Sequence, residues 1–103
     1  MTNTAHGQRA LVYIPNPDVV VRQEGDEALL FNPDTDRIKL INATGLFIWN
    51  RLDGRRNLGA ITKDVGEAFD KAPENLLSAQ IESFTQILKG DGFIGTLGEN
   101  DVD

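Results

Sequence analysis

Three short hydrophobic runs, separated by turn sequences, occupy the first half of the chain. Residues 19–22 are mostly β-branched, residues 28–31 are apolar throughout, and residues 37–41 alternate between polar and apolar side chains until the last position. The segments 24–26 and 32–36 between them contain Gly, Pro, Asn and Asp, which are the usual turn residues. Because the connections are so short, the pattern predicts a three-stranded antiparallel meander.

The alternation in the third strand also predicts which side chains face the core. Ile38 and Leu40 are expected to point inward, and Arg37 and Lys39 outward. A meander leaves this third strand at the edge of the sheet, with an unpaired row of N–H and C=O groups.

The second half of the chain switches to the period of helices. Asn42 and Asn57 stand where helix N-caps are expected, ahead of the segments 43–52 and 58–69. A third helix is expected from Pro73 to about residue 90. Its apolar positions are Leu77, Ile81, Phe84 and Leu88. Strands followed by three helices predict an α+β fold, arranged as a winged helix-turn-helix.

A single domain is expected to fill most of the 103 residues. It should span residues 10–97, between a flexible N-terminal tail at 1–9 and a short acidic tail at 98–103. Within it, residues 10–14 can pair as an additional strand, and residues 93–95 should return an apolar finger to the core.

The charge of the chain narrows the classes of partner. The formal net charge is -6, whereas nucleic acids and anionic membranes attract basic surfaces. No apolar run approaches the roughly 20 residues that cross a bilayer, and the first residues lack the apolar core of a signal peptide. With no cysteine in the chain, a cytoplasmic protein that binds neither nucleic acid nor membrane is the expectation.

The residues that most often carry catalysis do not converge. His6, the only histidine, falls in the N-terminal tail. Asp64, Glu67 and Asp70 are explained by the solvated face of the second helix. The run 32–36 imitates the opening of a calcium loop but lacks the glycine and the glutamate that such a loop requires. We therefore predict no enzyme, no metal ligand and no cofactor site.

Arg51, Arg55 and Arg56 form the one basic cluster, and two interpretations of it stay open. The cluster can hold an anion or an acidic partner. It can equally provide favourable charge at the carboxyl end of the first helix, together with a soluble turn.

A winged helix-turn-helix is also the layout of many DNA-binding regulators, which makes that function the main alternative. The third helix of such a regulator carries basic and amide side chains toward the bases. Here it offers Glu74, Glu82 and Gln80, with Lys89 alone near its end. Phosphate neutralisation would therefore be weak.

Four segments in order carry a resemblance to a known family. They are Pro-Asp-Val-Val-Val-Arg at 17–22, Ala-Leu-Leu-Phe-Asn at 28–32, Leu-Ile-Asn-Ala-Thr-Gly at 40–45 and, at 48–55, Ile-Trp followed by Leu-Asp-Gly-Arg. Together they resemble the PqqD-like family over about residues 17–93. The series of turn, capped helix and Asp-Gly-Arg break is its most specific part.

The resemblance implies a winged-helix peptide chaperone that recognises the leader of a ribosomally made, modified peptide. It also implies that the leader adds as a strand against the third β-strand, beside the third helix, and is presented to a modifying enzyme, often a radical SAM enzyme. A scaffold that only positions another protein is a further alternative. The peptide-binding residues carried over in this way are Arg37, Ile38, Lys39, Leu40, Ile41, Leu77, Gln80, Ile81 and Phe84.

Overall fold

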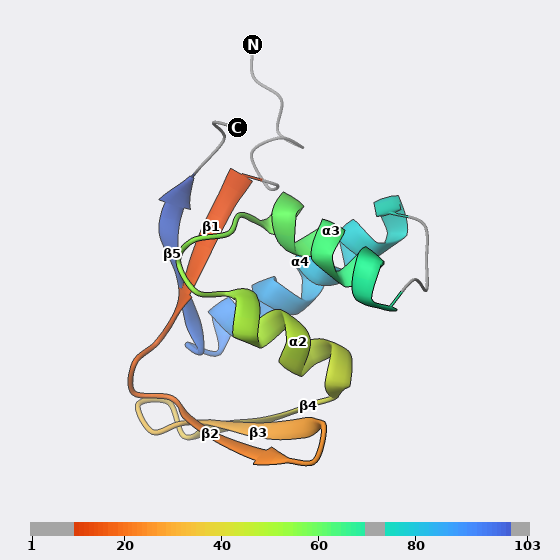
Figure 1. Cartoon of the computed structure of the whole chain (residues 1–103). Coiled ribbons are helices and arrows are strands. Elements are labelled where there is room, and N and C mark those ends of the chain that lie inside the picture. Colours follow the sequence, from red (N-terminus) through yellow and green to blue (C-terminus); the bar gives the residue numbers. More distant parts are fainter. Residues whose placement is uncertain (1–9, 70–73, 100–103) are drawn as a thin grey trace.

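The computed structural model describes residues 10–69 and 74–99. The elements in chain order are β1 (Leu11–Pro15), β2 (Val20–Glu24), β3 (Glu27–Asn32), β4 (Arg37–Ile41), α2 (Ala43–Arg51), α3 (Leu58–Phe69), α4 (Glu74–Gly90) and β5 (Ile94–Glu99). Strands β2, β3 and β4 form one antiparallel sheet, and β1 pairs with β5 in a second. Helices α2, α3 and α4 lie in the angle between the two sheets (Figure 1). His6, Asp70 and Pro73 lie outside the described residues.

The predicted meander is confirmed, and its turns fall where the turn residues stand. Glu24 pairs with Glu27, so the chain reverses through Gly25, whose φ of 65° suits a residue without a Cβ. At the second turn, Asn32 accepts a hydrogen bond from the backbone N–H of Asp34 at 2.9 Å.

Among the described residues, no group of three His, Cys, Asp or Glu side chains is placed to hold a metal ion.

The predicted orientation of β4 is wrong. Ile38 is 67% exposed and Leu40 is 64% exposed, whereas Ile41 is buried. Ile41 pairs with the buried Ala28, so the odd-numbered residues of β4 face the helices. The physical reason is the alternation of side chains along a strand. Because Ile41, the last residue of β4, is buried against the core, Ile38 and Leu40 point to the outer face of the sheet.

The second sheet completes the domain at its other end. The expected strand at residues 10–14 exists as β1, and its partner is β5, which the sequence indicated only as an apolar finger. Strand β5 includes Gly98 and Glu99, so the acidic tail does not begin at residue 98 as predicted. Residues 100–103 of that tail lie outside the described part of the chain.

Both predicted helix caps are confirmed. The side-chain oxygen of Asn42 accepts from the N–H of Gly45 at 2.8 Å, and that of Asn57 accepts from the N–H of Ala60 at 2.9 Å. A meander followed by three helices gives the predicted α+β arrangement. None of the helices in the described part of the chain is long and apolar enough to cross a membrane.

The core joins both sheets to the helices. Its largest fully buried apolar side chains are Tyr13, Phe93, Leu30, Leu52, Leu58, Ile61, Leu88 and Val65. Tyr13 is the one titratable group among them. Burial raises the pKa of its hydroxyl above the usual 10.0; the Thr85 side chain opposes this shift, and the Glu82 carboxylate adds to it.

This pKa shift predicts a loss of stability in alkali. Because the folded state favours the neutral phenol, the stabilisation is fully present below pH 10 and is lost as the pH rises through the raised pKa. We expect the melting temperature to fall more steeply above pH 10 in the wild-type chain than in Tyr13→Phe. Thermal melts between pH 8 and about 11 measure this, and parallel profiles for the two proteins would contradict it.

Candidate functional site

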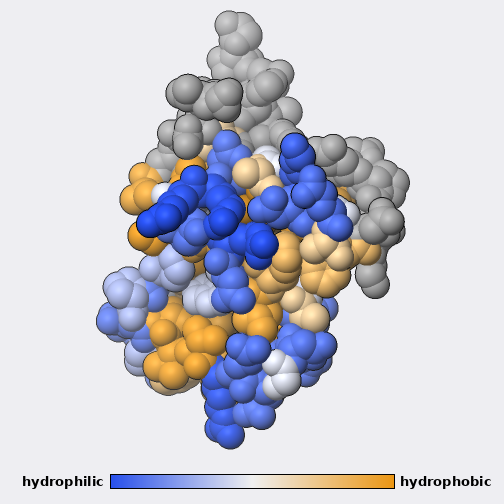
Figure 2. All heavy atoms as spheres, viewed as in Figure 1, coloured by the Kyte–Doolittle hydropathy of each residue, from blue (hydrophilic) through white to orange (hydrophobic). Residues whose placement is uncertain are grey.

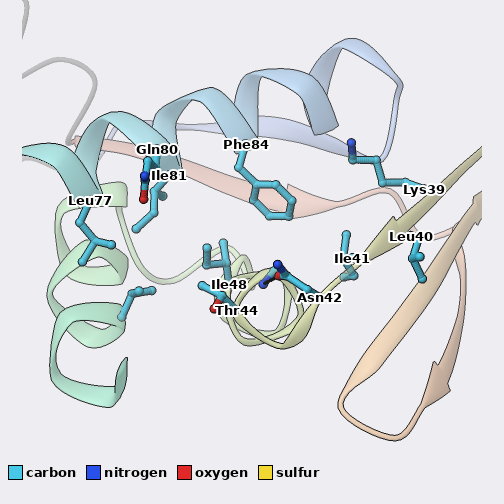
Figure 3. A pocket seen from close by; sticks show the side chains of 12 residues that line it. Lys39, Leu40, Ile41, Asn42, Thr44, Ile48, Leu77, Gln80, Ile81 and Phe84 are labelled. Carbon is cyan, nitrogen blue, oxygen red and sulfur yellow. Dashed lines mark hydrogen bonds between the residues drawn. The ribbon is translucent and has the colours of Figure 1, made fainter. Parts of the chain in front are cut away.

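An open groove lies between the carboxyl end of β4, the start of α2 and one face of α4 (Figure 3). Its volume is about 400 Å³. The residues that line it are Lys39, Leu40, Ile41, Asn42, Thr44, Gly45, Ile48, Val65, Leu77, Gln80, Ile81 and Phe84. We call it the β4–α4 groove.

The groove brings together most of the residues that were predicted to bind peptide. Strand β4 contributes three of them and α4 contributes four. They are Lys39, Leu40, Ile41, Leu77, Gln80, Ile81 and Phe84. The remaining two, Arg37 and Ile38, do not line the groove: Arg37 lies at the far end of β4, and the Ile38 side chain faces the outer side of the sheet.

The α4 wall follows from the spacing of its apolar residues. Leu77, Ile81 and Phe84 recur at intervals of four and three, so they lie on one face of the helix. Leu77 and Ile81 are buried, while Phe84 is half-buried and turns its ring toward α2 and β4 (Figure 3). A half-buried aromatic ring on an open groove offers apolar surface to a ligand.

Helices α2 and α3 supply a part of the groove that the sequence pattern did not predict. Ile48 and Val65 are buried in its floor, and Thr44 is half-buried. The signal was present, because the Asn42 cap places the first turn of an apolar helix directly after the edge strand. What the one-dimensional pattern lacked was the packing angle that brings this turn against α4.

Gly45 allows the groove walls to approach each other closely. A Cβ at this position would lie 3.1 Å from the Cβ of Ile41 and 3.3 Å from the Cζ of Phe84. Both distances are shorter than ordinary carbon–carbon contacts. The absence of a side chain at Gly45 therefore sets the separation between the β4 end of the groove and the Phe84 ring.

We expect Gly45→Ala to destabilise the protein by about 1 kcal/mol, although alanine is the better helix former. Gly66→Ala, in the adjacent helix, is the matched control, because a Cβ there meets only the Cδ2 of Leu77 at 3.6 Å. The control should gain about 0.5–1 kcal/mol. Urea unfolding measures both, and equal stabilisation by the two substitutions would contradict the close approach at Gly45.

The chemistry of the groove suits binding. Its floor is aliphatic, its rim carries the Gln80 amide and the Thr44 hydroxyl, and Lys39 is the one ionisable residue among the twelve that line it. General acid–base catalysis requires titratable groups that converge on the reacting atoms. The groove offers apolar surface and a positive charge instead.

The basic cluster receives a structural explanation. The most hydrophilic surface in Figure 2 covers the segment between α2 and α3. There Arg51 lies over the Phe47 ring, 3.7 Å from its centroid, and pairs with Asp64 at 3.2 Å. Arg56 pairs with Asp53 at 2.5 Å. Because Arg51 and Arg56 already have partners, the structure favours charge pairing over an anion site, and Asp64 has a structural role.

Strand β4 is an edge strand, as predicted. It pairs with β3 on one side only in the three-stranded sheet, so the N–H and C=O groups on its other side are open to a further strand. Neither Arg37 nor Lys39 forms an ion pair with a described residue. The chain thus presents an unpaired strand edge beside the groove, with Lys39 in the groove lining and Arg37 at the far end of β4.

The sequence of this chain matches a known family, and its fold matches solved structures. The sequence model of the family described as "Coenzyme PQQ synthesis protein D (PqqD)" matches residues 27–94, which is more than half of the chain. The match begins at β3 and ends with the first residue of β5, so it includes the whole groove. A search of curated proteins gives no match.

Two solved structures share the fold. One is described as "TbiB1 in Complex with the TbiA(beta) Leader Peptide"; it has a TM-score of 0.73 and 16% identity, and the alignment covers 84% of this chain and 99% of that one. The other is described as "Lasso peptide synthetase B1 complexed with the leader peptide", with a TM-score of 0.70, 16% identity, and coverage of 81% and 96%.

Proposed function

This chain belongs to the PqqD family, and on that premise we propose that it binds the leader segment of a ribosomally synthesised precursor peptide and presents it to a modifying enzyme. The leader would add as a strand to the free edge of β4 and place side chains in the β4–α4 groove. The observation that carries the proposal is an unpaired strand edge running along an apolar groove.

The two solved structures support leader-peptide binding as the function. Each shares this fold and is described as a complex with a leader peptide. The structural argument is separate from theirs, because it rests on β4 and on the residues that face it from α4. Neither comparison supports the DNA-binding alternative, and the net charge of -6 opposes it.

The magnitudes indicate where the affinity must arise. A main-chain hydrogen bond contributes about 1 kcal/mol net, whereas association costs about 4 to 15 kcal/mol in lost freedom. A few hydrogen bonds along β4 are therefore insufficient. Apolar leader side chains that contact Phe84, Ile41 and Ile48 must supply most of the remaining free energy.

We further propose that the chain makes no covalent bond itself. Binding would be carried by one domain, the predicted residues 10–97 together with the end of β5 at Glu99, in the cytoplasm where ribosomal precursors are made. The modifying enzyme that receives the leader would be, by the family resemblance, often a radical SAM enzyme. Arg37 and Lys39 would attract acidic residues of the leader toward an otherwise acidic protein.

Backbone NMR tests the proposal directly. The 15N-labelled chain is titrated with synthetic N-terminal segments of the short peptides that reading of the neighbouring genes yields as candidate precursors. We expect amide shifts from Arg37 to Asn42 and along the groove face of α4, with smaller changes in β2. Binding of duplex DNA at physiological salt, with no amide shifts on addition of the peptide, would instead support the alternative function of a DNA-binding regulator.

A further inference from the structure

The outer face of the β2–β3–β4 sheet carries an apolar cluster. In the register of the sheet, Phe31 pairs with Val20 and Ile38, and Leu29 pairs with Leu40, so these five side chains share one face. Figure 2 shows hydrophobic atoms gathered at this sheet, in the lower left of the view. Ala28 and Leu30 are fully buried on the face of β3 toward the helices, which cover one side of this sheet (Figure 1). Because side chains alternate along a strand, the cluster lies on the other side.

Two members of the cluster lie on the binding edge itself. Ile38 and Leu40, on β4, are 67% and 64% exposed, the highest values among the exposed large apolar side chains of the described residues. Edge strands are usually protected by outward-facing charges. Here the basic residues Arg37 and Lys39 are on the helix side of the strand, and the outer side of the edge is unprotected apolar surface.

A strand added to β4 has to place side chains on both faces. Side chains alternate along a strand, and directly opposite residues on neighbouring strands have Cβ atoms about 4.5–5.5 Å apart. One set of leader side chains would therefore enter the groove beside Ile41 and Phe84. The other set would lie against Ile38 and Leu40. Leu40 belongs to the groove lining, but in Figure 3 its side chain points away from α4.

We propose that Ile38 and Leu40 form a second recognition surface for the leader, which takes apolar, β-branched or aromatic side chains on the outward face of the added strand. The inference rests on the proposed function and sharpens it. The bound segment would be apolar on both faces, as in a central strand, rather than alternating between apolar and polar. Polar outward residues would leave Ile38 and Leu40 exposed to water in the complex.

The test uses a defined probe and matched variants. A displayed library of random 16-residue peptides is selected on the full chain, and selected peptides are synthesised with a fluorescent label for anisotropy measurements. We expect Ile38→Thr/Leu40→Thr to raise Kd by about 2- to 30-fold, the range for two cross-strand pairs. Threonine keeps the β-propensity of these positions. Val20→Thr is the control, because Val20 shares the face and is 56% exposed, but lies on the opposite edge strand.

A serine scan of the selected peptides identifies the outward positions. Serine there should weaken binding to the wild-type chain but not to Ile38→Thr/Leu40→Thr, whereas serine at groove-facing positions should weaken both. Peptides whose binding depends on Phe84 but not on Ile38 or Leu40 would overturn the inference and leave the proposed function standing. Selection of no peptide dependent on Phe84 would overturn both. A wild-type dimer that the double variant converts to a monomer would assign the face to a second copy of the chain, and would also overturn the inference.

Discussion

Replacing Phe84 with alanine is expected to weaken binding of the leader peptide by about 10- to 100-fold, or about 1.4–2.7 kcal/mol. The ring is half-buried in the groove wall and faces the start of α2 across the gap that Gly45 keeps narrow. Aromatic side chains at the centre of a desolvated contact usually account for most of the binding free energy. Isothermal titration calorimetry of the two proteins measures the effect.

Two further variants separate this contact from loss of fold or charge. Phe84 also packs against the core, so the thermal melt of Phe84→Ala must show a folded domain at the titration temperature. Phe84→Leu keeps part of the apolar contact and should bind with intermediate affinity. Arg37→Ala changes a residue outside the groove and should alter Kd by about twofold or less. Equal affinity for all variants would contradict the groove model.

The sequence predicted the parts of this fold that depend on local chemistry. The turn residues at 32–36 and the capping side chain of Asn42 each act within a few residues along the chain. For that reason the meander and the helix start could be placed from the pattern alone. The α4 face was predictable too, because the spacing of Leu77, Ile81 and Phe84 already specifies one side of a helix.

The errors came from interactions between distant segments. Strand β4 contains apolar residues of both parities, and only the packing of Ile41 against the core decides which parity is buried. Strand β5 was missed because Gly95 and Gly98 weaken its local signal, and it forms by pairing with β1 about 80 residues earlier. The α2 contribution to the groove likewise depends on helix packing.

The error at β4 changes the interpretation of the binding edge. With Ile38 and Leu40 inward, the edge would have shown basic side chains to solvent and apolar ones to the core. The observed parity instead brings Lys39 into the groove lining and leaves apolar side chains on the open face. A leader would therefore meet charge on the groove side of β4 and apolar surface on the other.

Replacing Asn32 with alanine is expected to cost about 2–3 kcal/mol of stability, measured by urea unfolding. Asn32 is 1% exposed at the end of β3. Its amide nitrogen donates to the carbonyl oxygens of Gly92 at 2.9 Å and Asp91 at 3.3 Å, and its side-chain oxygen accepts from the N–H of Asp34. Alanine would remove all three bonds, whereas the Gly92 carbonyl would keep the Asn16 amide as a donor and the Asp91 carbonyl would keep the Thr35 hydroxyl.

Thr35→Ala is the matched control for this effect. Thr35 belongs to the same turn and its hydroxyl also donates to the Asp91 carbonyl, at 3.3 Å, but this bond is exposed to solvent. Water can replace it, so the expected loss is about 0.5 kcal/mol or less. If Asn32→Ala cost no more than Thr35→Ala, the buried amide would not be what joins the meander to the end of α4.

The same contact predicts non-additivity with Gly92. This residue has a φ of 81°, and a Cβ there would lie 2.7 Å from the Nδ2 atom of Asn32, so Gly92→Ala should cost at least about 1 kcal/mol from backbone strain and crowding. In Asn32→Ala/Gly92→Ala the crowding disappears while the strain remains. The double variant should therefore lose less stability than the sum of the two single losses, by about 0.5 kcal/mol or more. Strict additivity would show that the Asn32 amide and a Cβ at position 92 do not clash. The turn between α4 and β5 would then be stabilised by its own backbone conformation.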